Sequence, residues 1–418
     1  MLHNRIRTIL DVGCFRSFKS LHLAFTACFA IGLGAGAGVS PDDSSSLKVK
    51  PLLGSSDSVR ISGPWGIVEI EKTELVPSLN SIQVADVIPE PASWFFAESD
   101  RDTAASFLES AGLNAAQSRM VQRADRWKAE AKGQTFLSDR EFLLGLTPDA
   151  RRTIYRRLAL DERNPSQRFP YTFASDQMES LLQKSGLRES TTEAIRKLLY
   201  AKGQSSCLAD VHEVFGMCAD DLEKQRFIRM LSRHPGVQLR VRLDSGSDLE
   251  TAVAYWGKGV PEPTVRSLLE SLWEADNRAS MDVVFFLPPL ARNLLHTYPG
   301  GDSLVRPNAS YWNCSWTALN FFAQRPDPRY VDLTLAEEAL QQECRLVKAD
   351  RAFGDVLVWR DELGKPLHMA VYVAGDVVFT KNGFDAQHPW TLMSMEQMAI
   401  RFPSDGIPKI EAYRKRSS

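Results

Sequence analysis

The sequence predicts an α+β protein, in which a mostly helical region, residues 59–298, precedes an antiparallel sheet with two helices, residues 299–418. Two observations lead to this prediction. Apolar residues recur at helical spacing from about residue 93 to 276, and after residue 299 two helix-patterned segments are followed by short strand-like runs. The Pro and Gly residues of Tyr298-Pro-Gly-Gly-Asp302 mark the boundary between the two regions.

Residues 1–37 have the organisation of a secretory signal peptide. A basic start is followed by the apolar run Leu21–Leu33 and by Ala35-Gly-Ala37, which offers small residues for cleavage. The apolar run is short for a membrane span. We therefore expect an exported protein, periplasmic or extracellular, without a membrane span after cleavage. An uncleaved anchor is the alternative.

The next segments read as a linker and a hairpin. Residues 38–58 are rich in Ser, Asp, Gly and Pro, which is typical of a linker. Val59–Val76 alternates apolar and polar residues around Gly63-Pro-Trp-Gly66, which predicts a short β-hairpin.

The helical region has recognisable helix starts. Ser138 followed by Glu141 matches a capping box, and Thr147-Pro148 predicts a helix with Pro in its first turn. Further helices are expected at residues 102–113, 176–185, 190–201, 220–233 and 263–275, with a small strand pair at Val237–Leu243 and Val283–Leu287.

This region contains no convincing chemical constellation. Its histidines, His212, His234 and His296, are isolated and are expected to be structural. Cys207 and Cys218 lack the spacing of a zinc site and are expected in the core rather than in a disulfide, although pairing stays open.

The C-terminal region has a clear order of elements. A helix is expected to begin at Asn313, a good N-cap residue, and to run to Phe322, and a second covers Thr334–Val347. Strands are expected at Asp355–Trp359, His368–Val373 and Val377–Thr380, with the turn Ala374-Gly-Asp376 joining the last two. Helices followed by an antiparallel meander give the α+β pattern.

Cys314 is the candidate nucleophile. It opens an apolar helix, and a helix N-terminus together with a nearby imidazole is expected to lower a thiol pKa. His368, at the start of a strand, is the candidate base, and His388, in a loop, is a weaker one. A third polar group should orient the base, and Asn382 is the first choice with Thr380 in reserve.

Candidate oxyanion and substrate residues flank the cysteine. They are the Cys314 backbone N–H, Tyr311 or Trp312 through a side chain, and the neighbours Asn313 and Ser315. The contrary interpretation is a buried, inert cysteine on an apolar helix.

These residues resemble the NlpC/P60 superfamily of papain-like cysteine peptidases. The shared order is Cys314-Ser at a helix start, Gly354-Asp-Val-Leu-Val-Trp, then His368-Met-Ala-Val-Tyr-Val, over about residues 300–400. The resemblance implies a cell-wall hydrolase that cuts amide bonds in peptidoglycan stem peptides. It also implies Cys314 as nucleophile, His368 as base and a third polar residue at Thr380 or Asn382.

The sequence departs from that family beside the nucleophile. Asn313 stands where the family usually has Asp, and Trp316 stands where it usually has Gly, so the substrate is open. The related CHAP amidases have a similar order of motifs. Two other interpretations remain: a non-catalytic wall- or protein-binding module on the same fold, and a cysteine acyl hydrolase or transferase acting on another substrate.

Composition sets the remaining expectations. The formal net charge of −2 gives no reason to expect nucleic acid as a partner. Phosphate-loop and nucleotide motifs are missing from the sequence, and the proposed chemistry requires neither a metal nor a cofactor. The expected partner is peptidoglycan or a peptide substrate, and the sequence carries no signal for an oligomeric state.

Overall fold

The computed structural model describes residues 58–82, 84, 93–299, 312–348, 350–361, 364–383, 388–404 and 409–416, and the pairing of residues 47–48 and 52–53. The expected signal peptide and Tyr311 lie outside the described residues. Two parts of the expected linker form short strands: β1 (Leu47–Lys48) pairs with β13 (Thr297–Tyr298), and β2 (Leu52–Leu53) pairs with β4.

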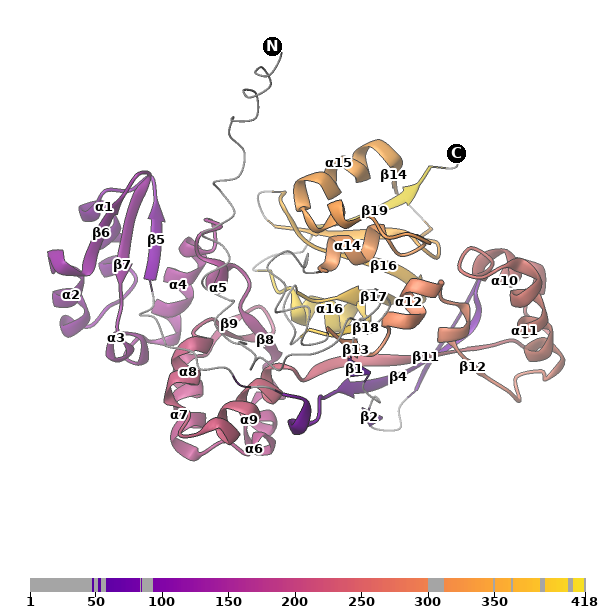
Figure 1. The fold of residues 1–418 in the computed structure, drawn as a ribbon, viewed down its shortest axis with the longest axis horizontal. Coiled ribbons are helices and arrows are strands. Elements are labelled where there is room, and N and C mark those ends of the chain that lie inside the picture. Colours follow the sequence, from indigo (N-terminus) through magenta and orange to yellow (C-terminus); the bar gives the residue numbers. More distant parts are fainter. Residues whose placement is uncertain are drawn as a thin grey trace, which may run out of the picture.

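The C-terminal region forms a six-stranded antiparallel sheet, in the order β14-β19-β15-β16-β17-β18 (Figure 1). Its strands are β14 (Cys344–Val347), β15 (Val356–Arg360), β16 (Pro366–Ala374), β17 (Val377–Lys381), β18 (Trp390–Ser394) and β19 (Lys409–Lys415). Its helices are α14 (Cys314–Leu319), α15 (Leu333–Glu343) and α16 (Met395–Arg401). The α+β prediction is therefore confirmed, and β15, β16 and β17 lie where strands were expected.

Helix α14 packs on one face of this sheet. The Phe321 ring, just after α14, lies 5.6 Å from the Phe379 ring of β17, and Trp390 of β18 donates a hydrogen bond of 3.0 Å to Thr317. The apolar run after Cys314 is thus the buried face of a helix.

A second sheet covers the opposite face. It consists of β2, β3 (Val59–Gly63), β4 (Gly66–Leu75), β11 (His234–Arg242) and β12 (Met281–Asp282). The hairpin predicted around residues 63–66 is confirmed, because Gly63 pairs with Gly66. The rings of Trp65 and Tyr372 lie 6.5 Å apart and join the two sheets. The expected strand Val283–Leu287 is wrong, since Val283–Phe286 forms a 3-10 helix.

Three helices accompany the second sheet in sequence, and Figure 1 shows two of them, α10 and α11, at one end of the long β4–β11 ribbon. They are α10 (Leu249–Trp256), α11 (Glu262–Glu274) and α12 (Pro289–Leu294). The helix expected at residues 263–275 is confirmed.

Residues 93–231 form a separate unit, called the middle unit below. Its helices are α1 (Arg101–Ser110), α2 (Ala115–Val121), α3 (Arg140–Leu144), α4 (Pro148–Leu158), α5 (Pro165–Arg168), α6 (Met178–Ser185), α7 (Glu189–Leu198), α8 (Val211–Met217) and α9 (Asp221–Leu231). Two small sheets, β5-β7-β6 and β8-β10-β9, accompany them. Their strands are β5 (Ser93–Ala97), β6 (Trp127–Glu130), β7 (Gly133–Leu137), β8 (Tyr171–Ala174), β9 (Tyr200–Lys202) and β10 (Ser205–Leu208).

The predictions for the middle unit hold for most helices and fail for its strands. Thr147 caps α4 as expected, but Asp139 rather than Ser138 caps α3, accepting a hydrogen bond from the Phe142 N–H. The six short strands were not predicted, because runs of three to five residues carry little periodicity and depend on distant pairing partners. Cys207 and Cys218 are not joined by a disulfide.

The buried apolar residues form two clusters. One lies within the middle unit and its flank, from Ile82 to Leu231. The other joins the C-terminal sheet to residues 65–70 and 237–295. The division between the clusters therefore does not coincide with the expected boundary at residue 298, because the β4–β11 sheet shares its core with the C-terminal sheet.

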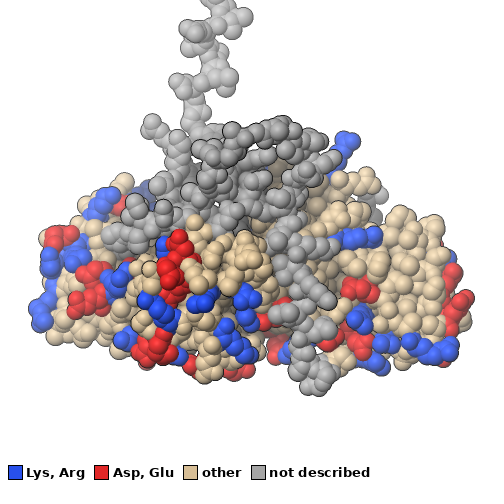
Figure 2. All heavy atoms as spheres, turned by 60° about the horizontal axis from the view of Figure 1, so that its bottom comes forward, with Lys and Arg blue, Asp and Glu red and all other residues tan. Residues whose placement is uncertain are grey.

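Figure 2 shows that acidic and basic side chains are interspersed over one face of the molecule. No helix among the described residues is long and apolar enough to cross a membrane.

Candidate active site

Asn313 caps helix α14 as predicted, and this occupies its side chain. Its Oδ1 accepts a hydrogen bond of 2.9 Å from the Trp316 N–H, and its Nδ2 donates one of 2.8 Å to the Val331 carbonyl. The oxygen and one N–H of this amide thus already have partners, and the substrate-binding role expected for Asn313 stays a prediction.

Ser315 is also committed to the structure around α14. Its hydroxyl is buried, 2.8 Å from Asn313 Oδ1 and 2.7 Å from the Tyr330 carbonyl oxygen. The side chain therefore does not offer the oxyanion contact expected for it. Trp316 is buried and stacks on Trp312, with ring centroids 4.7 Å apart, so it belongs to the core.

Cys314 is the first residue of α14 and is partly buried. Burial raises the pKa of this thiol, while the backbone N–H groups of Met369 and Ser315 and the charge of Lys381 act in the opposite direction. The prediction that the helix start lowers the pKa of the Cys314 thiol is therefore wrong. Desolvation outweighs the first turn of a helix that is only six residues long.

His368 is held by a chain of hydrogen bonds along the neighbouring strand. Its Nε2 lies 2.7 Å from Thr380 Oγ1, and the Thr380 hydroxyl donates a hydrogen bond of 3.0 Å to Asn382 Oδ1. The prediction that Asn382 orients the imidazole directly is corrected: Thr380 makes the contact, and Asn382 acts through it. We call these three residues the His368 relay.

The relay fixes the tautomer of His368. The Asn382 amide is oriented by its Nδ2, which lies 2.8 Å from the Met393 sulfur, so its oxygen faces Thr380. The single Thr380 proton goes to that oxygen, and Thr380 must then accept from His368 Nε2–H. Nδ1 is therefore the unprotonated nitrogen, which is the one able to accept a proton.

The surroundings also keep His368 neutral. Burial lowers the pKa of its imidazole well below the usual range, and the nearby Arg401 and His388 act in the same direction. The ring stacks on Phe402 at 4.1 Å and meets the Trp359 ring edge-on at 5.7 Å.

The Cys314 thiol contacts the backbone at the start of β16, whereas the His368 ring projects from the other face of the sheet. The thiol lies beside the N–H of Met369, the residue that follows His368. Met369 lies before the paired part of β16 and β17, which runs from Val371 to Ala374. Among the described residues, no hydrogen bond joins the Cys314 sulfur to the His368 ring. Side chains alternate along a strand, so His368 projects to the face opposite α14, together with Thr380.

Sequence reasoning missed three contributors to this site and gave His388 a different role. Lys381 is buried on the α14 side, with its ammonium 5.3 Å from the Trp390 ring centroid. Arg401 and Phe402 come from the end of α16, a helix that was not predicted. His388 accepts a hydrogen bond from Arg401 rather than acting as a base for the thiol. Only the aromatic or charged character of these residues was visible in the sequence.

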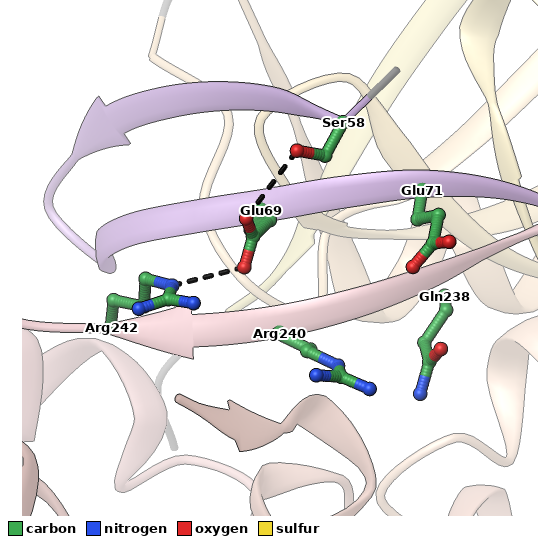
Figure 3. Close-up of a pocket in the computed structure, with 6 residues that line it drawn as sticks. All are labelled: Ser58, Glu69, Glu71, Gln238, Arg240 and Arg242. Carbon is green, nitrogen blue, oxygen red and sulfur yellow. Dashed lines mark hydrogen bonds and ion pairs between the residues drawn. The ribbon is translucent and has the colours of Figure 1, made fainter. Parts of the chain in front are cut away.

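A polar hollow of about 270 Å³ lies elsewhere, on the outer face of β4 and β11 (Figure 3). Glu69 faces it and is neutralised by Arg242 at 2.9 Å and Arg60 at 3.2 Å. The neighbouring residues Val68 and Ile70 point to the opposite side, toward the C-terminal sheet. The hollow is lined by polar side chains without a nucleophile and is separate from Cys314, so it is not the candidate site.

No cluster of three or more metal-ligating side chains occurs in the part of the chain that the structure describes. Comparison with family models, curated proteins and solved structures gives no match for this chain.

Proposed function

We propose that the C-terminal sheet and α14 form a cysteine hydrolase for amide bonds, with peptidoglycan stem peptides as the substrate class that the NlpC/P60 resemblance implies. The observation that supports this most is the His368 relay, which leaves Nδ1 unprotonated at the residue before Met369, whose N–H contacts the Cys314 thiol. A hydrolase that starts from a neutral thiol and a neutral imidazole needs that nitrogen free to accept a proton.

The proposed reaction starts from a neutral thiol and a neutral imidazole. Because the pKa of Cys314 is raised and that of His368 is lowered, an ion pair is disfavoured before substrate binds. The reaction requires the His368 ring to reach the α14 side of the sheet, where Nδ1 takes the thiol proton as sulfur attacks the amide carbon. The resulting imidazolium gives the proton to the leaving amine, and a thioester with Cys314 remains. Water, deprotonated by His368, then releases the acid and restores the thiol.

Backbone groups at the start of α14 are suited to assist this chemistry. The N–H groups of Cys314 and Ser315 both face the sulfur, where they lower the thiol pKa. The first N–H groups of a helix have no intrahelical acceptor. An oxygen anion forming on the carbon attached to sulfur would lie within reach of the same donors.

The test is product analysis by mass spectrometry. Full-length protein and a Cys314→Ala variant are incubated with purified cell-wall fragments and, in parallel, with lipid amides. We expect new amine and carboxyl ends in wall peptides with the native protein alone. Cleavage of lipid amides alone would move the assignment to a non-wall acyl hydrolase, and equal cleavage by the variant would overturn it.

A non-catalytic binding module is the second candidate. It is favoured by the high thiol pKa and by the lack of a hydrogen bond between Cys314 and His368 among the described residues. An electrophilic peptide, such as a vinyl sulfone, separates the two. A hydrolase should gain one adduct on Cys314 and none on Cys344, whereas a binding module should bind the peptide without an adduct.

A further inference from the structure

The C-terminal end of α16 is held by the middle unit. Ser205 of β10 donates a hydrogen bond of 2.6 Å to the Ile400 carbonyl, and Thr172 of β8 donates one of 3.0 Å to the Arg401 carbonyl. The last carbonyls of a helix have no intrahelical donor, and here side chains more than 190 residues away in sequence supply it. The end of α16 is therefore fixed by a different structural unit.

Arg401 extends this contact into the candidate site. One guanidinium nitrogen donates to Thr172 Oγ1 at 2.8 Å, and the other donates to the Asn382 carbonyl at 3.1 Å and to His388 Nε2. The His388 ring in turn stacks on Tyr171 of β8, with centroids 5.5 Å apart. A single side chain thus joins β8 of the middle unit to the residue that ends the His368 relay.

Phe402 follows directly and covers the candidate base. Its ring stacks on His368 with centroids 4.1 Å apart and an interplanar angle of 21°. Trp359 meets the same imidazole from β15. The position of Phe402 depends on the backbone of Ile400 and Arg401, because it is the residue at which α16 ends.

We propose that the middle unit fixes the candidate base: Thr172 and Ser205 hold the end of α16, so that Arg401 and Phe402 keep the His368 ring in place. This rests on the proposed hydrolase function. It gives residues 93–231 a role in the reaction, as a support for the site. Thr172 and Ser205 are positioning residues in this account, since they act through α16 and do not touch the reacting atoms.

The test compares two pairs of hydroxyl groups on β8 and β10 or directly beside them. In the full-length protein, Thr172→Val with Ser205→Ala removes the contacts to α16. The control pair, Ser175→Ala with Ser206→Ala, removes a 3.1 Å contact within the middle unit. We expect kcat to fall about 5- to 30-fold in the first variant, as for the loss of one or two buried hydrogen bonds. The control should remain near the native value, and Thr172→Ser should restore activity.

A second measurement is independent of turnover. The His368 ring resonance is followed by NMR in protein labelled at histidine, with His368→Gln used for assignment. Loosening of Phe402 should admit water and raise the pKa of His368 in the first variant but not in the control. An unchanged His368 titration would overturn the positioning role even if kcat fell. A raised pKa in a protein without hydrolase activity would keep the coupling and reject only the proposed function.

Discussion

Two buried polar networks, one in the middle unit and one in the C-terminal sheet, differ in the side chains that form them and in their roles. In the middle unit, Arg151 meets Asp210 at 2.7 Å, and the Tyr155 hydroxyl lies 2.7 Å from both carboxylate oxygens. Arg151 also donates to the Leu143 and Lys197 carbonyls. The Arg151 and Asp210 side chains have no exposed surface, and their charges pair with each other.

The His368 relay is different because it consists of neutral groups and stops at an unprotonated nitrogen. The network around Arg151 pairs a buried charge and ties α4 to the residues preceding α8. The relay leaves His368 Nδ1 without a proton beside the strand position that contacts Cys314. A network whose charges pair with each other stabilises the fold. A network that ends at an unprotonated nitrogen leaves a group that can take part in proton transfer.

The largest expected effect comes from removing the base. His368→Gln should lower kcat by about 10²- to 10⁴-fold, because general base catalysis contributes on that order. His212→Gln in the middle unit is the matched control, since His212 is partly exposed beside Glu213 and far from the relay in sequence. Steady-state hydrolysis of a wall peptide measures both. Equal losses in the two variants would show that His368 has no special role.

Breaking the network around Arg151 should lower stability rather than activity. Asp210→Asn leaves the Arg151 charge buried without its partner, which should lower the free energy of unfolding by about 3–5 kcal/mol. Urea unfolding followed by circular dichroism measures this. At low temperature, where the protein stays folded, kcat per folded molecule should be nearly unchanged. A large loss of kcat with unchanged stability would reverse the roles that we assign to the two networks.

Shortening the relay should have a smaller catalytic effect. Thr380→Val removes the acceptor of His368 Nε2–H, and kcat should fall about 10- to 100-fold because the tautomer is no longer fixed. Thr391→Val on β18 is the control, since its buried hydroxyl donates a hydrogen bond of 3.1 Å to the neighbouring Leu392 carbonyl and lies outside the relay. A Thr380 variant as active as the native protein would contradict the relay.

The smallest expected effect is on the pH dependence of the free energy of unfolding. The folded pKa of His368 lies below its unfolded value of about 6.5, so between the two the unfolded chain binds an extra proton. Stability from this group is complete above about pH 6.5 and falls by up to about 1.4 kcal/mol for each unit of pH lowered, until the folded pKa is reached. Thermal unfolding of the native protein and of His368→Gln is measured over this pH range. The plots of unfolding free energy against pH should differ in slope by this amount, and parallel plots would refute the burial argument.

The sequence revealed the local features of the site but not its long-range contacts. The helix start at Asn313, the hairpin at Gly63–Gly66 and strands β15, β16 and β17 follow from capping, turn and alternation rules. The direct contact of His368 with Thr380 rather than Asn382 depends on which residues share a face of the sheet. The raised pKa of Cys314 depends on how deeply the thiol is enclosed, which residue order does not specify.

The contacts that hold the end of α16 could not be predicted from local sequence patterns. Its end is held by Thr172 and Ser205, about 200 residues earlier in the chain. The core shared by the β4–β11 sheet and the C-terminal sheet is likewise formed by segments far apart in sequence. Periodicity describes one element at a time, so neither contact could be predicted from the sequence.

The most direct test of the account is the tautomer of His368. Nitrogen-15 NMR of histidine-labelled protein at pH 7, assigned with His368→Gln, distinguishes a protonated from an unprotonated ring nitrogen. We predict a neutral ring with the proton on Nε2, a tautomer that the Thr380→Val variant should hold less firmly. A proton on Nδ1, or a charged ring at pH 7, would contradict the proposal that His368 is poised to accept the proton of Cys314.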